Sequence, residues 1–122
     1  MKLLADGSLG GRTALMNEPY ADEPNNYGIS TFTQTELNDL VMLADSHGMD
    51  VAIHGIGDRC IDMILEAISH SKKTTNRVAR HSIIHAQLAN HSQIERMKKL
   101  DVGAQTQPIF LNSDIPIIAS RL

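Results

Sequence analysis

Val51-Ala52-Ile53-His54-Gly55 and Ser82-Ile83-Ile84-His85-Ala86 are the two stretches that decide the fold of this chain. In each, an apolar run rich in β-branched residues ends at a histidine, and a turn and a helical pattern follow. This pattern predicts a buried strand leading into a helix. Repeated strand–helix units predict an α/β fold with a parallel sheet and right-handed crossovers.

His54 and His85 occupy equivalent positions at the carboxyl ends of the two predicted strands. Ligands and metals bind at this edge of parallel sheets and barrels. Neutral imidazole is the commonest metal ligand in proteins, so the pair is a candidate metal site. The alternative is that each histidine only bonds a nearby carbonyl group. The repetition in neighbouring units favours the metal interpretation but leaves the alternative open.

The rest of the chain continues the alternation of strands and helices. Two capping-box patterns, Thr33 with Glu36 and Asn90 with Gln93, open two of the predicted helices. The third helix is expected to turn Ile94, Met97 and Leu100 inward. The expected elements are strand 2–5, loop 6–33, helix 33–48, strand 50–54, helix 58–71, strand 81–85, helix 90–100, strand 102–106 and a short helix after residue 110.

Residues 6–33 are rich in glycine, proline, asparagine and aspartate and show no period of a helix or strand. Loops of this length inside a compact domain usually bind ligands or cover a site. This one would cover the edge after the first strand. The alternative is a disordered connector.

Composition narrows the class of protein. Charged residues make up 20% and the net charge is −3, so no basic surface for nucleic acid is expected. The apolar runs are far shorter than a membrane span, and no signal peptide is visible, so we expect a cytoplasmic protein. Cys60 is the only cysteine and is expected to be a small buried hydrophobe.

Three motifs resemble one family when taken together: Lys2-Leu3-Leu4-Ala5-Asp6-Gly7-Ser8-Leu9-Gly10-Gly11-Arg12-Thr13-Ala14, Ala52-Ile53-His54-Gly55-Ile56-Gly57-Asp58-Arg59 and Arg80-His81-Ser82-Ile83-Ile84-His85-Ala86-Gln87. Gln107-Pro108 and Asp114 agree with the same pattern. The chain resembles the amidohydrolase 3 family of metal-dependent hydrolases, which includes N-substituted formamide deformylases. The resemblance implies hydrolysis of non-peptide C–N bonds in small amide-like substrates, with one or two divalent metal ions, zinc first among them.

The length is the main difficulty for this interpretation. The resemblance implies a (β/α)8 TIM barrel, which typically needs about 250 residues, and this chain has 122. The family's His-x-His pair is absent, and its last-strand aspartate would lie beyond Leu122. We therefore expect residues 1–122 to be the central part of a barrel domain. That part would hold loop 6–33 and three to four βα units over residues 34–122.

By the same resemblance, Lys2, His54 and His85 are the expected catalytic and metal-binding residues. Lys2 matches a lysine that can take up carbon dioxide and bridge two metals; otherwise it is a solvated terminal residue. Asp58 would orient His54 or, more simply, cap the next helix. Ile84 stands where the family often has glutamate. His47, His70 and His91 are expected on the surface, and the position of His81 is ambiguous.

Two functions are open at this point. The chain is part of a metal-dependent amidohydrolase, or it is a catalytically inactive barrel remnant that acts as a structural or interaction module. A flavodoxin-like domain is disfavoured because no helical pattern follows the glycines at 7–11. Uncovered strands and sheet edges would also make the chain associate with itself, so a homo-oligomer is expected.

Overall fold

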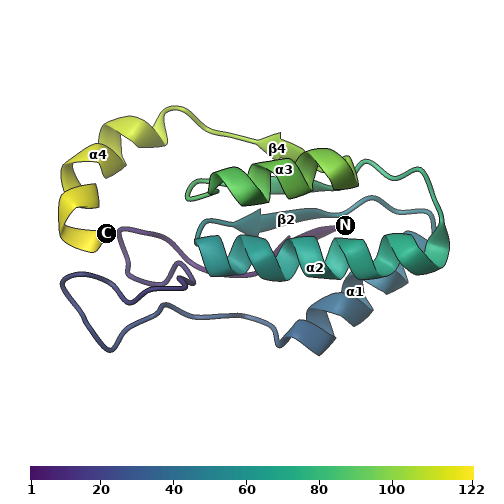
Figure 1. The fold of residues 1–122 in the computed structure, drawn as a ribbon, viewed down its shortest axis with the longest axis horizontal. Coiled ribbons are helices and arrows are strands. Elements are labelled where there is room, and N and C mark those ends of the chain that lie inside the picture. Colours follow the sequence, from purple (N-terminus) through teal and green to yellow (C-terminus); the bar gives the residue numbers. More distant parts are fainter.

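The computed structural model describes residues 1–122 as four parallel strands that alternate with four helices (Figure 1). The strands pair in chain order, β1-β2-β3-β4. The elements are β1 (Lys2–Leu4), α1 (Gln34–Ser46), β2 (Ala52–Gly55), α2 (Asp58–Thr75), β3 (Ser82–His85), α3 (His91–Leu100), β4 (Gly103–Gln105) and α4 (Phe110–Arg121). The predicted α/β fold with a parallel sheet of three to four βα units is confirmed.

Local sequence signals set most of the helix ends. The Thr33 side chain accepts a hydrogen bond from the Glu36 backbone N–H, and the Glu36 side chain bonds back to Thr33. The same reciprocal pair joins Asn90 and Gln93 at the start of α3. Both predicted capping boxes are thus confirmed. Helix α2 runs four residues further than predicted, to Thr75, and is followed by Asn76 in the left-handed conformation that closes helices.

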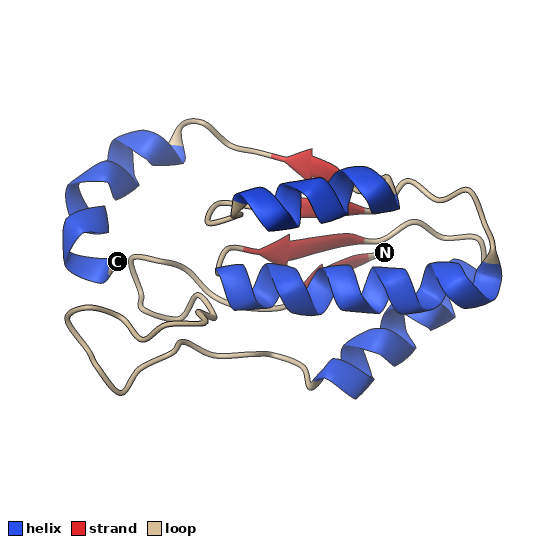
Figure 2. Cartoon of the chain, viewed as in Figure 1, coloured by secondary structure: helices blue, strands red, loops and turns tan.

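The core lies between the sheet and the helices packed on one face of it (Figure 2). Ile53 of β2 and Ile83 of β3 are fully buried there. Helix α2 lies at the centre of this layer, with a buried apolar stripe that packs against α1, α3 and β2. The stripe consists of Ile61, Ile64, Leu65, Ala67 and Ile68, together with the buried Cys60. The prediction of a buried Cys60 is confirmed.

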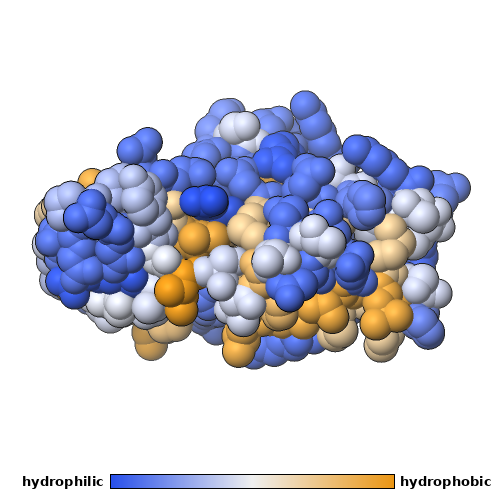
Figure 3. All heavy atoms as spheres, turned by 90° about the horizontal axis from the view of Figure 1, so that it is seen from below, coloured by the Kyte–Doolittle hydropathy of each residue, from blue (hydrophilic) through white to orange (hydrophobic).

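The opposite face of the sheet has no helical cover. Leu4, His54, Ile84 and Gln105 are aligned by the strand register and so point to this face. Leu4 is 56% exposed, and Gln105 is exposed as well. Figure 3 shows hydrophobic residues gathered along one side of the molecule while the other side is largely hydrophilic. The strands are therefore buried on one face only.

Helix α3 is rotated relative to the prediction. Met97 is buried as expected, but Ile94 is 51% exposed, so its predicted inward position is wrong. The inward position belongs to Gln93, whose Nε2 donates to the carbonyl oxygen of Asp58 at 2.7 Å. Because the hydrogen-bonded Gln93 side chain faces inward in the first turn of α3, the next residue, Ile94, faces solvent.

The long segment between β1 and α1 packs as a structured loop rather than as a disordered connector. Leu9, Ala14, Met16 and Tyr20 form a small core of their own with Ile56. The Tyr20 hydroxyl donates to the Ala14 carbonyl at 2.9 Å, and burial raises the pKa of Tyr20 to about 12. This loop and α4 both lie beyond the carboxyl ends of the strands (Figure 1).

Helix α4 is longer than the short helix expected after residue 110 and contains Pro116. No helix of the protein is long and apolar enough to cross a membrane.

Candidate metal-binding site at the strand ends

His54 and His85 come together at the carboxyl ends of neighbouring strands. The register pairs His54 with Ile84 and Gly55 with His85, so the two histidines are offset by one residue. Their ring centroids are 4.7 Å apart, and the planes make an edge-to-face angle of 78°. The predicted convergence of the two rings is confirmed.

The backbone at His85 is what makes this convergence possible. In a regular strand His85 would point to the same face as Ile83, toward the helices. Instead His85 has φ +73° and Ala86 has φ +48°, both in the left-handed region that non-glycine residues rarely adopt. This turn carries the imidazole to the strand end beside His54. Backbone conformations of this kind cluster at functional sites.

The protonation of the His54 ring follows from its neighbours. Nε2 lies 2.9 Å from the carbonyl oxygen of Gly7 and 3.3 Å from Oδ1 of Asp6. Both partners accept hydrogen bonds, so Nε2 carries the proton. In the neutral ring Nδ1 then keeps its lone pair for a ligand. The carbonyl contact that was the alternative to metal binding is therefore present, and it leaves the other ring nitrogen available.

His85 has an unused nitrogen inside the protein. Its Nδ1 is buried and has no hydrogen-bond partner, which is uncommon for a buried polar atom. Burial lowers the pKa of His85, and the nearby His54 and Lys2 lower it further. The ring is therefore neutral near pH 7, which is the form that binds metals.

Asp6 holds this part of the site together, a role that was not predicted beyond its membership of a motif. Its side chain is fully buried and accepts three backbone N–H groups: from Leu15 at 3.0 Å, Ile56 at 3.1 Å and Gly57 at 2.8 Å. The available signal was its position, a carboxylate two residues after β1 and directly before a glycine. Asp6 thus joins β1, the long loop and the end of β2.

Close packing around Asp6 also explains Gly57. A Cβ atom at this position would lie 1.9 Å from the carbonyl oxygen of Leu15, which is backbone and cannot move aside. Gly57 is therefore needed for the loop to approach the end of β2.

Lys2 pairs with Ala52 of β2, two residues before His54. Side chains two residues apart on a strand point to the same face, so Lys2 and His54 share one face of the sheet. Lys2 is exposed, and no hydrogen bond joins it to either histidine. The structure therefore brings two of the three predicted site residues together and leaves Lys2 nearby.

Asp58 does not contact His54, but its carboxylate accepts the Arg59 N–H at 2.8 Å in the first turn of α2. The N-cap of α2 is Gly57, and Asp58 is the first helical residue. Its carboxylate accepts the backbone and side-chain N–H groups of Asn17, at 2.9 and 3.0 Å. The loop competes for this carboxylate because it packs against the start of α2. Asp58 therefore ties down the long loop.

Of the other four histidines, three are exposed and one is buried. His47, His70 and His91 are exposed, as predicted. His81 is buried at the opposite end of the sheet, where Nδ1 accepts the Val51 N–H at 3.1 Å.

His54 and His85 are side chains of a type that binds divalent metals, but two ligands are fewer than a metal site usually has. Neutral imidazoles suit zinc and similar ions, and His85 Nδ1 is an unpaired buried donor atom. A catalytic zinc site usually has three protein ligands. No group of three or more histidine, cysteine, aspartate and glutamate side chains is arranged to hold a metal ion. Two donors of the right chemical type, His54 and His85, would therefore be available to such an ion.

A parallel βα sheet with two imidazoles at its strand ends places these side chains where ligands and metals bind in α/β proteins. Over residues 1–122 the sequence matches the Amidohydrolase family, Amidohydro_3. The chain belongs to this family, and its structure matches part of the amidohydrolase TIM barrel.

Individual relatives agree with this assignment. The chain is 40% identical over its full length to the protein of Bacillus subtilis named "Putative amidohydrolase YtcJ", and covers 23% of that protein. It is 30% identical over 81 residues to the N-substituted formamide deformylase of Arthrobacter pascens, covering 66% of this chain and 15% of that enzyme. An uncharacterized metal-dependent hydrolase of Pyrococcus furiosus superposes on the whole chain with a TM-score of 0.89 and 38% identity. The chain spans about a quarter of that structure, 25% of its length.

Proposed function

We propose that this chain supplies part of the metal centre of a hydrolase that cleaves non-peptide C–N bonds in amide-like or formamide-like substrates. The observation that carries the proposal is the convergence of His54 and His85, with ring centroids 4.7 Å apart at adjacent strand ends. Family membership and the names of the relatives support the reaction class.

Each residue has a defined part in this proposal. His54 would hold the ion through Nδ1, because Gly7 and Asp6 accept the hydrogen bond of the protonated Nε2. His85 is the second ligand, and Lys2, if carboxylated, is the third. A divalent ion at such a site lowers the pKa of bound water and polarises a carbonyl group. Asp6 and Gly7 keep the His54 ring in one tautomer and one orientation.

Zinc titration followed by imidazole NMR tests the ligand assignment on this chain. We expect the ring nitrogens of His54 and His85 to respond together at the same zinc concentration. The His85→Ala variant should weaken the response of His54 by at least tenfold, because one of two ligands is lost. The matched control is His70→Ala, which removes an exposed imidazole on α2.

Two results would contradict the assignment. One is a zinc response confined to exposed histidines such as His70. The other is a His54 response that is the same with and without His85.

The second candidate function is an inactive barrel remnant that binds a partner. It is favoured by one observation, the lack of any group of three ligand-type side chains. The two functions differ in what zinc does: a remnant whose histidines only brace the backbone gives no paired response of His54 and His85.

A further inference from the structure

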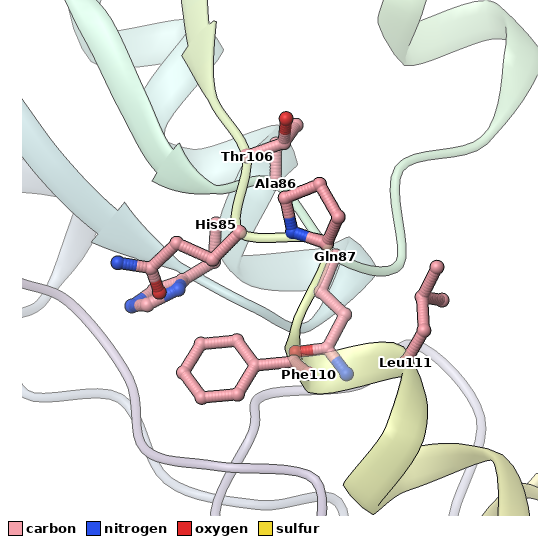
Figure 4. Close-up of a pocket in the computed structure, with 8 residues that line it drawn as sticks. His85, Ala86, Gln87, Thr106, Phe110 and Leu111 are labelled. Carbon is pink, nitrogen blue, oxygen red and sulfur yellow. The ribbon is translucent and has the colours of Figure 1, made fainter.

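A cavity opens directly beside His85. It has a volume of about 230 Å³ and lies between the end of β3, the end of β4 and the first turn of α4. Figure 4 shows His85, Phe110 and Leu111 arranged around it. Its lining consists of His85, Ala86, Gln87, Thr106, Gln107, Pro108, Phe110 and Leu111.

The wall of this cavity carries no aspartate, glutamate, lysine or arginine. One side is apolar, formed by Pro108, Phe110 and Leu111, and the Phe110 ring lies 5.3 Å from the His85 ring. Gln87 is fixed because its Nε2 donates to the carboxylate of Asp114, outside the lining. A charged group entering this space would lose its hydration without gaining a partner of opposite charge.

The volume is also informative. Sites for whole small molecules usually measure about 300–1,000 Å³. A cavity of about 230 Å³ accepts one substituent, with the remainder of the molecule extending toward the two histidines.

We propose that this cavity selects uncharged substrates by binding a small apolar substituent next to the bond that is cleaved. This inference rests on the proposed function, because that function places the reacting bond beside His85. A second cavity differs because charged residues contribute to its lining. This larger cavity of about 740 Å³, between the long loop and the helices, is lined in part by Glu36 and Arg59.

Three compounds of similar size test the proposal by chemical-shift mapping of the ¹⁵N-labelled chain. N-isobutylacetamide is neutral and apolar, N-acetyl-β-alanine carries a carboxylate, and N-acetylethylenediamine carries an ammonium group. The titrations contain EDTA, so that binding is measured without metal and stands apart from the ligand roles of His54 and His85.

We expect N-isobutylacetamide to give saturable shifts of the Ala86, Gln87, Phe110 and Leu111 amides. Its dissociation constant should be on the order of 1–10 mM, as for other ligands with so few atoms. Both charged compounds should bind at least tenfold more weakly. Shifts that do not saturate, shifts centred elsewhere, or equal binding of a charged compound would overturn the proposal.

Substitutions provide the matched comparison. Leu111→Asp adds a carboxylate at a position that is 58% exposed, so the chain keeps its fold, and it should weaken N-isobutylacetamide at least fivefold. Leu43→Asp makes the same change at a 54% exposed position on α1 and should leave binding unchanged. Equal effects of both substitutions would also overturn the proposal. A failed zinc response with intact amide selectivity would count against the proposed function alone.

Discussion

Removing the carboxylate of Asp6 is the most direct perturbation of the strand-end site. Asp6→Ala leaves the backbone N–H groups of Leu15, Ile56 and Gly57 without their acceptor in a buried position. Each buried group left unpaired costs roughly 1–3 kcal/mol, and water entering the new space recovers part of that loss. We therefore expect the free energy of unfolding to fall by roughly 3–6 kcal/mol.

This loss is large relative to the whole. At roughly 0.05–0.15 kcal/mol per residue, a chain of this size unfolds with about 6–18 kcal/mol. Urea denaturation followed by circular dichroism at 222 nm measures the change. With a slope of about 2 kcal/mol per molar urea, the midpoint should move down by roughly 1.5–3 M.

The matched control is Asp22→Ala, the same chemical change on the surface. Asp22 pairs with Arg12 at 2.8 Å and also with Arg121, and ion pairs near the surface contribute little to stability. Its midpoint should stay close to that of the wild type. A midpoint for Asp6→Ala that matches Asp22→Ala would refute the reasoning, because the three backbone bonds would then contribute nothing measurable.

Three further predictions concern acid, metal and association. Burial lowers the pKa of His81 below its ordinary 6.5, so stability is fully present above about pH 6.5 and is lost as the pH falls. The charged groups that influence His81 are Asp45, Asp50, Arg77 and Lys72. The urea midpoint should drop between pH 7.5 and 5.5, and less so in His81→Gln; an equal drop in both would contradict the role of His81. After dialysis, elemental analysis should find well under one zinc ion per chain, and assays should find no amidase activity. One tightly bound equivalent of zinc would contradict this prediction. Light scattering after size exclusion should find a dimer at tens of micromolar, weakened by Leu4→Lys on the uncovered sheet face; a wild-type monomer would rule the dimer out.

Local sequence patterns were sufficient to predict the order of the strands and helices. Apolar runs ending in turns located β2 and β3, and the Thr33 and Asn90 capping boxes located α1 and α3, because these signals depend on residues only a few positions apart. The same patterns placed His54 and His85 at neighbouring strand ends. The inward side of α3 was predicted incorrectly because it depends on a contact between distant residues. The Gln93 side chain bonds to Asp58, 35 positions away, and therefore faces inward.

By itself, then, the sequence determined a parallel α/β fold of the amidohydrolase kind with two histidines at one edge. Only the tertiary structure decided how those histidines are used. The His54 tautomer is fixed by Asp6 and by Gly7, which lies 47 positions away. The left-handed turn at His85 and Ala86 lies where the Ala86 N–H bonds the Gly55 carbonyl of the neighbouring strand at 3.1 Å. The cavity beside His85 likewise forms where residues 85–87 and 106–111 meet. No local periodicity encodes such contacts, because they exist only once the strands have paired and the long loop has packed against their ends.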